Sequence, residues 1–154
     1  MEKKVYIGSD HAGYELKEIL KEYLINTLKL SVIDKGAFSL NKDDDYPDYI
    51  RPVAESVASD EASLGIVLGG SGEGEQIVAN KIDGVRAIEY YGGTLEIIKL
   101  GREHNDANIL SIGARFVNKH EAKKAVEIFI KTSFSKEERH KRRLDKIKRI
   151  EEKN

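Results

Sequence analysis

Cysteine is absent from this sequence of 154 residues. Its absence excludes disulfides, thiolate metal sites and a cysteine nucleophile or base. Long apolar runs are missing too, since no window approaches the ~20 residues that span a membrane. The first apolar run, in MEKKVYIGSDHAG, is too short for a signal peptide. We therefore expect a cytoplasmic protein with no membrane partner.

The sequence also lacks an excess of charge of either sign. Lys and Arg number 26 against 27 Asp and Glu, and the net charge is −1. No global field would draw the chain onto nucleic acid, so any anion must be bound by a local cluster. A hydrophobic fraction of 40% suits a globular protein, and the length fits one domain over residues 1–154.

Short apolar runs alternate with amphipathic segments along the chain. Strands are predicted at residues 5–9, 30–34, 64–68, 85–89 and 109–112. Helices are predicted at residues 12–28, 47–58, 75–81, 94–103, 121–130 and about 135–152. Asn118 with Glu121, and Ser135 with Glu138, have the spacing of capping boxes before the last two helices. The alternation predicts an α/β fold, a Rossmann-like three-layer sandwich around a five-stranded parallel sheet.

Ligands in such folds bind beyond the carboxyl ends of the strands. Three polar or glycine-rich segments are predicted there: residues 9–11, residues 69–75 and the residues after the fifth strand. We expect these segments to meet at one edge of the sheet.

The glycine loop GGSGEGE, residues 69–75, is neither a dinucleotide fingerprint nor a Walker A loop, since its spacing and ending differ from both. The plainer interpretation is a tight turn that needs glycine. Backbone N–H groups at a helix start also bind anions, but Glu73 and Glu75 would repel a phosphate. A carboxylate beside such donors suits proton abstraction next to a carbonyl, where the donors hold the developing oxyanion.

Five motifs together resemble one family. They are GSDHAGYELK at 8–17, YPD at 46–48, GGSGEGEQIVANK at 69–81, REHNDANIL at 102–110 and SKEERHKRRLDKI at 135–147. The set is similar to the ribose-5-phosphate isomerase B family, which includes the galactose-6-phosphate isomerase subunits. The resemblance covers about residues 4–147.

The resemblance implies an aldose–ketose isomerase that works through a cis-enediolate and needs no cofactor and no metal. Many members carry a cysteine base at the position of Gly69 or Gly70, which is glycine here. A second branch uses a glutamate, and Glu75 matches it. The plainer role of Glu75 is to complement the dipole of its helix. For Glu73 we hypothesise that its charge raises the pKa of Glu75.

The resemblance also implies residues that hold the sugar. Ser71 would hydrogen-bond the reacting oxygens. Backbone donors and side chains of the substrate pocket would come from Gly70, Gly72, Gly74, Asp10, His11 and Tyr46. Asp10 could equally be a helix cap, and Tyr46 a packing residue before proline.

Two histidines compete for the role of ring-opening acid–base. By resemblance His104 and Asn105 meet the sugar, and His140 is the alternative. The glutamate branch points to His140, which we prefer. His120 has no counterpart in the family and is expected at the surface.

Three arginines are candidates for the substrate phosphate. Arg139 and Arg143 are four residues apart and share a helix face, and Arg115 follows the fifth strand. On charge pattern alone, the RHKRR run would be a solvated face or a nucleic-acid patch. The resemblance favours phosphate, and it implies a homodimer or a tetramer whose sites are shared between chains.

We therefore expect interconversion of ribose 5-phosphate and ribulose 5-phosphate. A hexose-6-phosphate isomerase, acting on allose or galactose 6-phosphate, is the nearest alternative. A sugar-phosphate binding protein without activity is another, although Glu75 argues against it.

Overall fold

The computed structural model describes residues 3–154, and its centre is a parallel sheet of five strands. The strands run in the order β2-β1-β3-β5-β4. Their bounds are β1 Lys4–Ser9, β2 Ser31–Asp34, β3 Leu64–Gly69, β4 Ala87–Tyr90 and β5 Ile109–Gly113. Every neighbouring pair is parallel. The predicted α/β fold is confirmed, and all strands end at one edge of the sheet.

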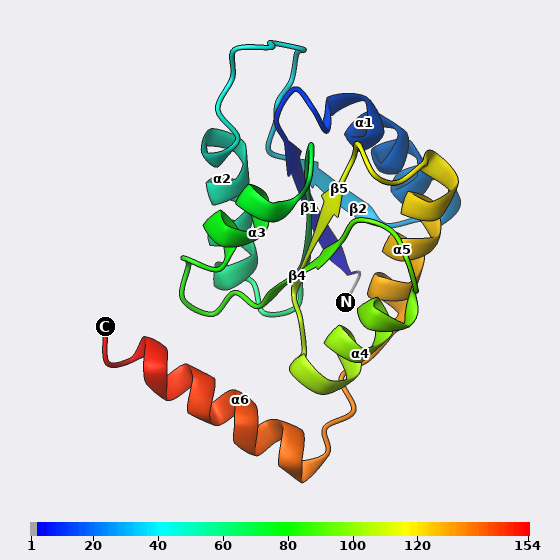
Figure 1. Cartoon of the computed structure of the whole chain (residues 1–154). Coiled ribbons are helices and arrows are strands. Elements are labelled where there is room, and N and C mark those ends of the chain that lie inside the picture. The colour runs from blue at the N-terminus through cyan, green and yellow to red at the C-terminus, as the bar shows by residue number, and fades with distance from the viewer. Residues whose placement is uncertain (1–2) are drawn as a thin grey trace.

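Helices cover both faces of the sheet, which makes three layers (Figure 1). Their bounds are α1 Tyr14–Glu22, α2 Pro47–Ser59, α3 Glu73–Ala79, α4 Glu96–Asn105, α5 Lys119–Lys131 and α6 Glu138–Glu151. One core packs α1, α4 and α5 against the sheet, and a second packs α2 and α3 on the other face. The apolar periodicity seen in the sequence lines these two cores.

The predicted helix over residues 12–28 is wrong in its bounds. The helix α1 begins at Tyr14, and a π-helical turn, Tyr23–Thr27, follows Glu22. The wider turn keeps Leu24 buried, and the N–H of Leu28 donates to the carbonyl of Tyr23 at its end. Apolar spacing predicts the buried face of this segment but not the change of helical pitch within it.

Of the two predicted capping boxes, one is confirmed. Asn118 and Glu121 exchange side-chain and backbone hydrogen bonds at the start of α5. The second prediction is wrong, because the cap of α6 is Glu137 and its side chain makes no capping bond. The hydroxyl of Ser135 instead bonds Nδ1 of His140 and accepts from the N–H of Glu137.

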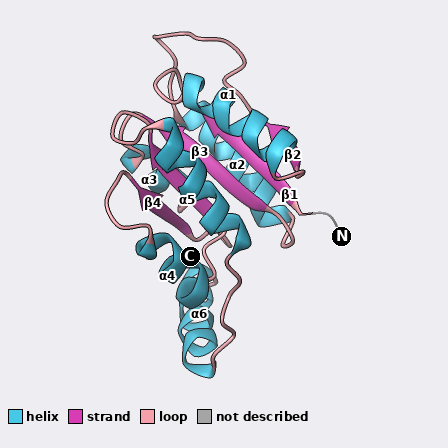
Figure 2. Ribbon diagram, turned by 90° about the vertical axis from the view of Figure 1, so that its right-hand side faces the viewer, coloured by secondary structure: helices cyan, strands magenta, loops and turns pink. Residues whose placement is uncertain are grey.

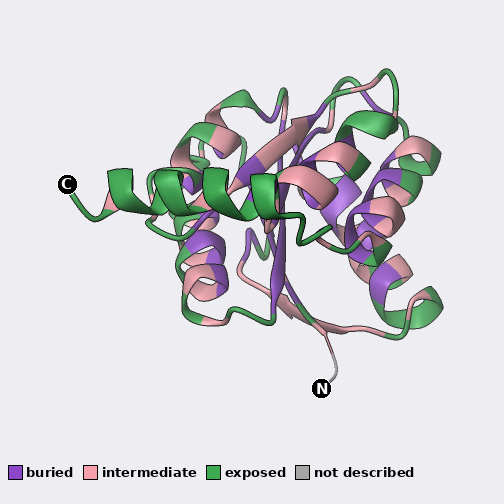
Figure 3. Cartoon of the chain, turned by 90° about the horizontal axis from the view of Figure 1, so that it is seen from below, coloured by how far each residue is buried: buried purple, intermediate pink, exposed green. Residues whose placement is uncertain are grey.

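The last helix, α6, lies apart from the sandwich, beside the edge where the strands begin (Figure 2). It buries His140 and leaves most of its length exposed (Figure 3). A groove of about 500 Å³ separates it from that edge, lined by Lys3, Arg86, Arg102 and the α6 residues Lys148 and Glu151. Within residues 3–154, no helix is both long enough and apolar enough to cross a membrane.

Candidate active site

The carboxyl ends of three neighbouring strands bring the predicted segments together. β1 ends before Asp10, β3 leads into the loop at Gly70, and β5 ends before Arg115. The N–H of Arg115 donates to the carbonyl of Gly70 at 3.0 Å, which ties the loop after β5 to the glycine loop. The predicted meeting point at the carboxyl edge is confirmed.

Contacts with β5 hold the glycine loop in place. Gly72 caps α3 with a φ of 86°, a left-handed conformation that favours glycine. Its carbonyl accepts a hydrogen bond of 2.7 Å from the buried hydroxyl of Ser111. A Cβ on Gly113 would collide with the carbonyl of Ser71. The loop backbone is therefore held at close range, with N–H groups at the start of a helix.

Glu75 lies in the first turn of α3, yet its side chain turns back toward the sheet. The residue is only 4% exposed. A Cβ added to Gly69 would collide with the Glu75 carboxyl, so this carboxyl occupies the space beside the last residue of β3. A glutamate in the first turn of a helix complements the helix dipole without being buried. Its burial favours the alternative role of a base.

The surroundings of Glu75 raise its pKa. Burial is the largest cause, and the nearby charge of Asp10 raises the pKa further. The backbone N–H groups of Glu75 itself and of Gly72 oppose the shift. A carboxylate with a raised pKa accepts a proton more readily, which suits a general base near neutral pH. The hypothesis that Glu73 causes this shift is not supported, since Asp10 is the neighbouring charge that does so.

Glu73 is exposed and acts on a different carboxyl, that of Glu89 in β4. The pKa of Glu89 is raised to about 7, first by burial and then by the charges of Glu73 and Glu75. Among residues 3–154, its Oε1 atom is buried without a hydrogen-bond partner. Glu89 was not among the residues selected from the sequence, although an acid within the short strand AIEY was the available signal.

Tyr46 and Arg115 border the glycine loop on two sides. A Cβ on Gly74 would lie 2.6 Å from the Tyr46 ring, and one on Gly70 would lie 3.0 Å from the Arg115 guanidinium. The hydroxyl of Ser71, which is exposed, accepts from the N–H of Glu73 at 3.2 Å. Phenol, guanidinium and hydroxyl groups therefore surround the loop that carries Glu75.

Asp10 both caps the turn before α1 and faces the site. Its Oδ1 accepts from the N–H groups of Ala12 and Gly13 at 3.0 and 3.2 Å, as the capping interpretation requires. Its charge nevertheless reaches Glu75. Capping therefore does not remove the charge of Asp10 from the surroundings of Glu75.

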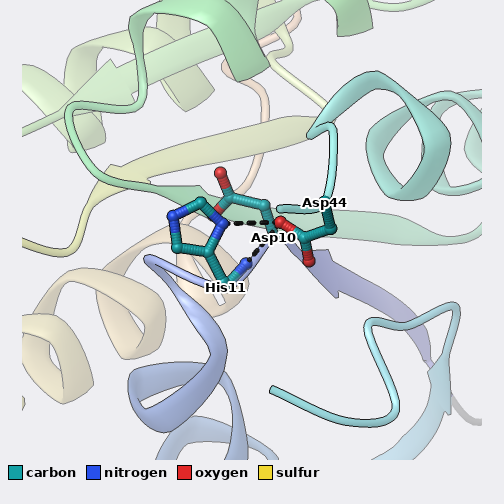
Figure 4. Close-up of side chains that lie close together, drawn as sticks. All are labelled: Asp10, His11 and Asp44. Atoms are coloured by element: carbon teal, nitrogen blue, oxygen red, sulfur yellow. Dashed lines mark hydrogen bonds and ion pairs between the residues drawn. The ribbon is translucent and has the colours of Figure 1, made fainter. Parts of the chain in front are cut away.

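His11 pairs with Asp44, which lies in the acidic loop before α2 (Figure 4). Asp10, His11 and Asp44 each offer one potential ligand atom within 4.8 Å of the others. Sequence spacing did not reveal this group, because 33 residues separate His11 from Asp44. The hydrogen bond between His11 and Asp44 already gives both side chains a partner.

The remaining candidates gather where the strands begin, at the opposite edge. The rings of His104 and His140 stack 4.3 Å apart, at 37° to each other. The carbonyl of Asn105 accepts from the side chain of Arg86, which lies just before β4. Residues Arg139 and Arg143, on α6, are exposed. His120 is exposed as expected.

The two histidines of this pair differ in access. His140 is buried with Nδ1 bonded to Ser135 at 2.8 Å, and burial together with the charges of His104 and Arg139 lowers its pKa. His104 is only partly buried. The His104 ring is therefore the more accessible of the two, which argues against the sequence-based preference for His140.

A single chain separates the predicted site into two groups. We call the residues at the carboxyl edge the base group: Asp10, His11, Tyr46, Gly70, Ser71, Gly72, Gly74, Glu75 and Arg115. We call the residues at the amino edge the histidine–arginine group: His104, Asn105, Arg139, His140 and Arg143. The sheet lies between the two groups, so one chain does not assemble them into one pocket.

Known proteins share this fold and much of this sequence. Residues 5–147 match the ribose/galactose isomerase family. Ribose-5-phosphate isomerase B of Mycobacterium leprae is 45% identical, over 96% of this chain and 90% of the relative. A putative sugar phosphate isomerase of Bacillus subtilis is 41% identical, over 98% of this chain and 99% of the relative.

A solved structure extends the likeness to the fold. Ribose-5-phosphate isomerase B from Mycoplasma genitalium, with bound ribulose-5-phosphate, superposes with a TM-score of 0.93 at 38% identity. The match covers 100% of this chain and 99% of that one. Together with the family match over most of the sequence, it shows that this chain belongs to the ribose/galactose isomerase family.

Proposed function

We propose that this protein interconverts ribose 5-phosphate and ribulose 5-phosphate. The observation that carries the proposal is the buried carboxylate of Glu75, held beside Gly69 at the start of α3. Relatives named as ribose-5-phosphate isomerases support the pentose, and the Mycoplasma genitalium relative holds ribulose-5-phosphate. The proposed unit is one isomerase domain formed by residues 1–154.

The reaction moves one proton between neighbouring carbons. Glu75 takes the proton from C2 of the open aldose, and the electrons of the broken bond form the enediolate. The backbone N–H groups of the loop, Gly70 to Gly74, and the Ser71 hydroxyl stabilise the oxygen that gains negative charge. Glu75 returns the proton to C1 while the proton of the C2 hydroxyl moves to the oxygen on C1, which leaves the ketose. Nothing is oxidised overall, so the step calls for no redox cofactor.

The active site combines two chains in this proposal. The base group of one chain receives the histidine–arginine group of a second chain, in a homodimer or in a tetramer made of such dimers. Arg139 and Arg143 then bind the phosphate together with Arg115, and His104 assists ring opening. Exposed apolar rings support a partner at the carboxyl edge, since Tyr91 and Phe116 pack edge to face near the ends of β4 and β5.

Activity assays on ribose 5-phosphate, allose 6-phosphate and galactose 6-phosphate test the function, using the parent and Glu75→Gln. We expect pentose turnover that falls at least ~1,000-fold in the variant, because the base is lost. Glu73→Gln, two residues away and exposed, is the matched control and should retain most of the activity. Turnover on a hexose phosphate alone would change the substrate. Sugar-phosphate binding without turnover would make the protein a sensor.

A further inference from the structure

Asp44 differs from the acids beside it. It lies in the loop NKDDD, where Asp43 and Asp45 are exposed. The Asp44 side chain is only 3% exposed. Removing a carboxylate from water is costly unless hydrogen bonds or an opposite charge compensate. The position of this one acid therefore depends on its partner in the fold.

That partner is His11, which contacts Asp44 twice. Oδ1 of Asp44 accepts from the backbone N–H of His11 at 3.1 Å and lies 2.6 Å from its ring Nδ1. The first contact fixes the loop to the end of β1, and the second fixes the ring. Among residues 3–154, Oδ2 of Asp44 is buried without a partner, so both interactions converge on one oxygen.

The contact with the ring determines which nitrogen carries the proton. A carboxylate accepts hydrogen bonds, so Nδ1 of His11 must be the donor. The other ring nitrogen, Nε2, is directed away from Asp44 (Figure 4). The His11 side chain is 28% exposed, so the ring is not enclosed by the fold, and it lies close to Asp10.

We propose that Asp44 is a positioning residue that holds His11 with Nδ1 protonated and Nε2 presented to the sugar-phosphate substrate. The proposal rests on the proposed function, in which His11 belongs to the substrate pocket. Asp44 acts through His11 and does not touch the substrate. In this arrangement the acidic loop contributes to substrate binding through one buried member.

The first test compares Asp44→Asn with Asp43→Asn, which removes the same charge from an exposed neighbour. The amide keeps an acceptor for the His11 backbone, so the loop retains its anchor. We expect KM for ribose 5-phosphate to rise roughly tenfold in Asp44→Asn with little change in kcat, as loss of a charge-assisted hydrogen bond predicts. Asp43→Asn should match the parent. Equal effects of the two variants would overturn the proposal.

A double variant tests whether Asp44 acts through His11. In a His11→Asn background, Asp44→Asn should cause little further rise in KM, because its partner is already gone. Additive losses would show that Asp44 acts independently, and would overturn the proposal. Thermal unfolding of each variant separates these effects from loss of folding.

The state of the His11 ring tests the proposal without any turnover. Nitrogen NMR, assigned by the signal lost in His11→Asn, should show a protonated Nδ1 in the parent and a shift toward the Nε2–H form in Asp44→Asn. An Nε2–H ring in the parent would refute the assignment even if the enzyme is active. The expected ring without isomerase activity would sink the proposed function alone. Activity that needs Mn²⁺ or Zn²⁺ after chelation, and fails in Asp44→Asn, would instead make Asp44 a metal ligand.

Discussion

The base group and the histidine–arginine group are built in different ways. The base group surrounds the ends of β1, β3 and β5, and its central side chain, Glu75, is buried. The histidine–arginine group lies on α4 and α6, and its arginines are exposed. The sheet fixes the base group, whereas the arginines of the histidine–arginine group extend from α6, a helix that lies apart from the sheet.

This difference shows which part of the proposed site a single chain completes. Close packing fixes Glu75, since the Gly69 backbone and the loop N–H groups surround its carboxyl. Arg139 contacts Glu137, the cap residue of its own helix, and its side chain is 56% exposed. The chain therefore contains a closely packed carboxylate, which is the proposed base, and, separately, a set of exposed cations on α6.

Among the changes that test the difference between the two groups, we expect the largest effect from disturbing the packing around Glu75. Gly69→Ala places a methyl group where the Glu75 carboxyl lies. We expect activity to fall about 100-fold or more, because small displacements of a catalytic group are that costly. The variant should remain folded in a thermal unfolding scan. Adding Gly69→Ala to Glu75→Gln should cost little more, and a further large loss would show that Gly69 acts elsewhere.

Mixing two inactive chains tests whether the groups combine across a dimer. Glu75→Gln lacks the base, and Arg139→Ala with Arg143→Ala lacks the phosphate cations. Random hybrids should regain about one quarter of parent activity, since half the dimers are hybrid and each has one intact site. Each variant mixed with itself is the control. No recovery in verified hybrids would mean that each site uses one chain.

Single substitutions of His104 and His140 distinguish the two stacked rings of the histidine–arginine group. His104→Asn should lower kcat on ribose 5-phosphate roughly 100-fold, because the more accessible ring is expected to transfer the proton. His140→Asn should have a smaller effect, through the position of the His104 ring. The reverse order would restore the sequence-based preference for His140. His120→Asn is the exposed control.

The smallest expected effect concerns Glu89, whose pKa is raised to about 7. The folded state then holds a proton that the unfolded chain releases near pH 4.5, so this stabilisation is complete below pH 4.5 and is lost as pH rises through about 7. Solvent screening limits the change to about 1 kcal/mol. Thermal unfolding at pH 5 and pH 8 should show it in the parent and not in Glu89→Gln. An equal change in stability between pH 5 and pH 8 in the parent and in Glu89→Gln would contradict this role of Glu89.

Much of the fold could be predicted from the sequence because apolar periodicity reflects burial. The five strands and their common edge follow from the alternation of short apolar runs with amphipathic segments. The π-helical turn at Tyr23–Thr27 could not be foreseen, since it leaves the apolar spacing of that segment almost unchanged. The false capping box at Ser135 shows a second limit, because the hydroxyl found a competing partner in His140.

The site was predictable where its residues are close in sequence. Gly69 to Glu75 form one continuous loop, so its residues indicated a carboxylate beside backbone donors. The family resemblance then selected Glu75, whose role as the base remains a prediction. Asp44 could not be selected among three consecutive aspartates, because only the fold shows which one reaches His11. The shared site came from the family resemblance and stays a proposal, while the separation of the two groups is visible in one chain.

Because Gly69 and the Glu75 carboxyl are in close contact, a side chain at position 69 and the carboxyl of Glu75 cannot occupy this space together. A side chain at position 69 would enter the volume that the Glu75 carboxyl fills. A chain can therefore place a reactive group there from the end of β3 or from the first turn of α3, but not from both. Exchanging one arrangement for the other needs substitutions at both positions. Adding a side chain at position 69 first would crowd the site, and removing the Glu75 carboxyl first would leave it without a reactive group. The family resemblance implies two kinds of base at this point, and this barrier would keep them in separate branches.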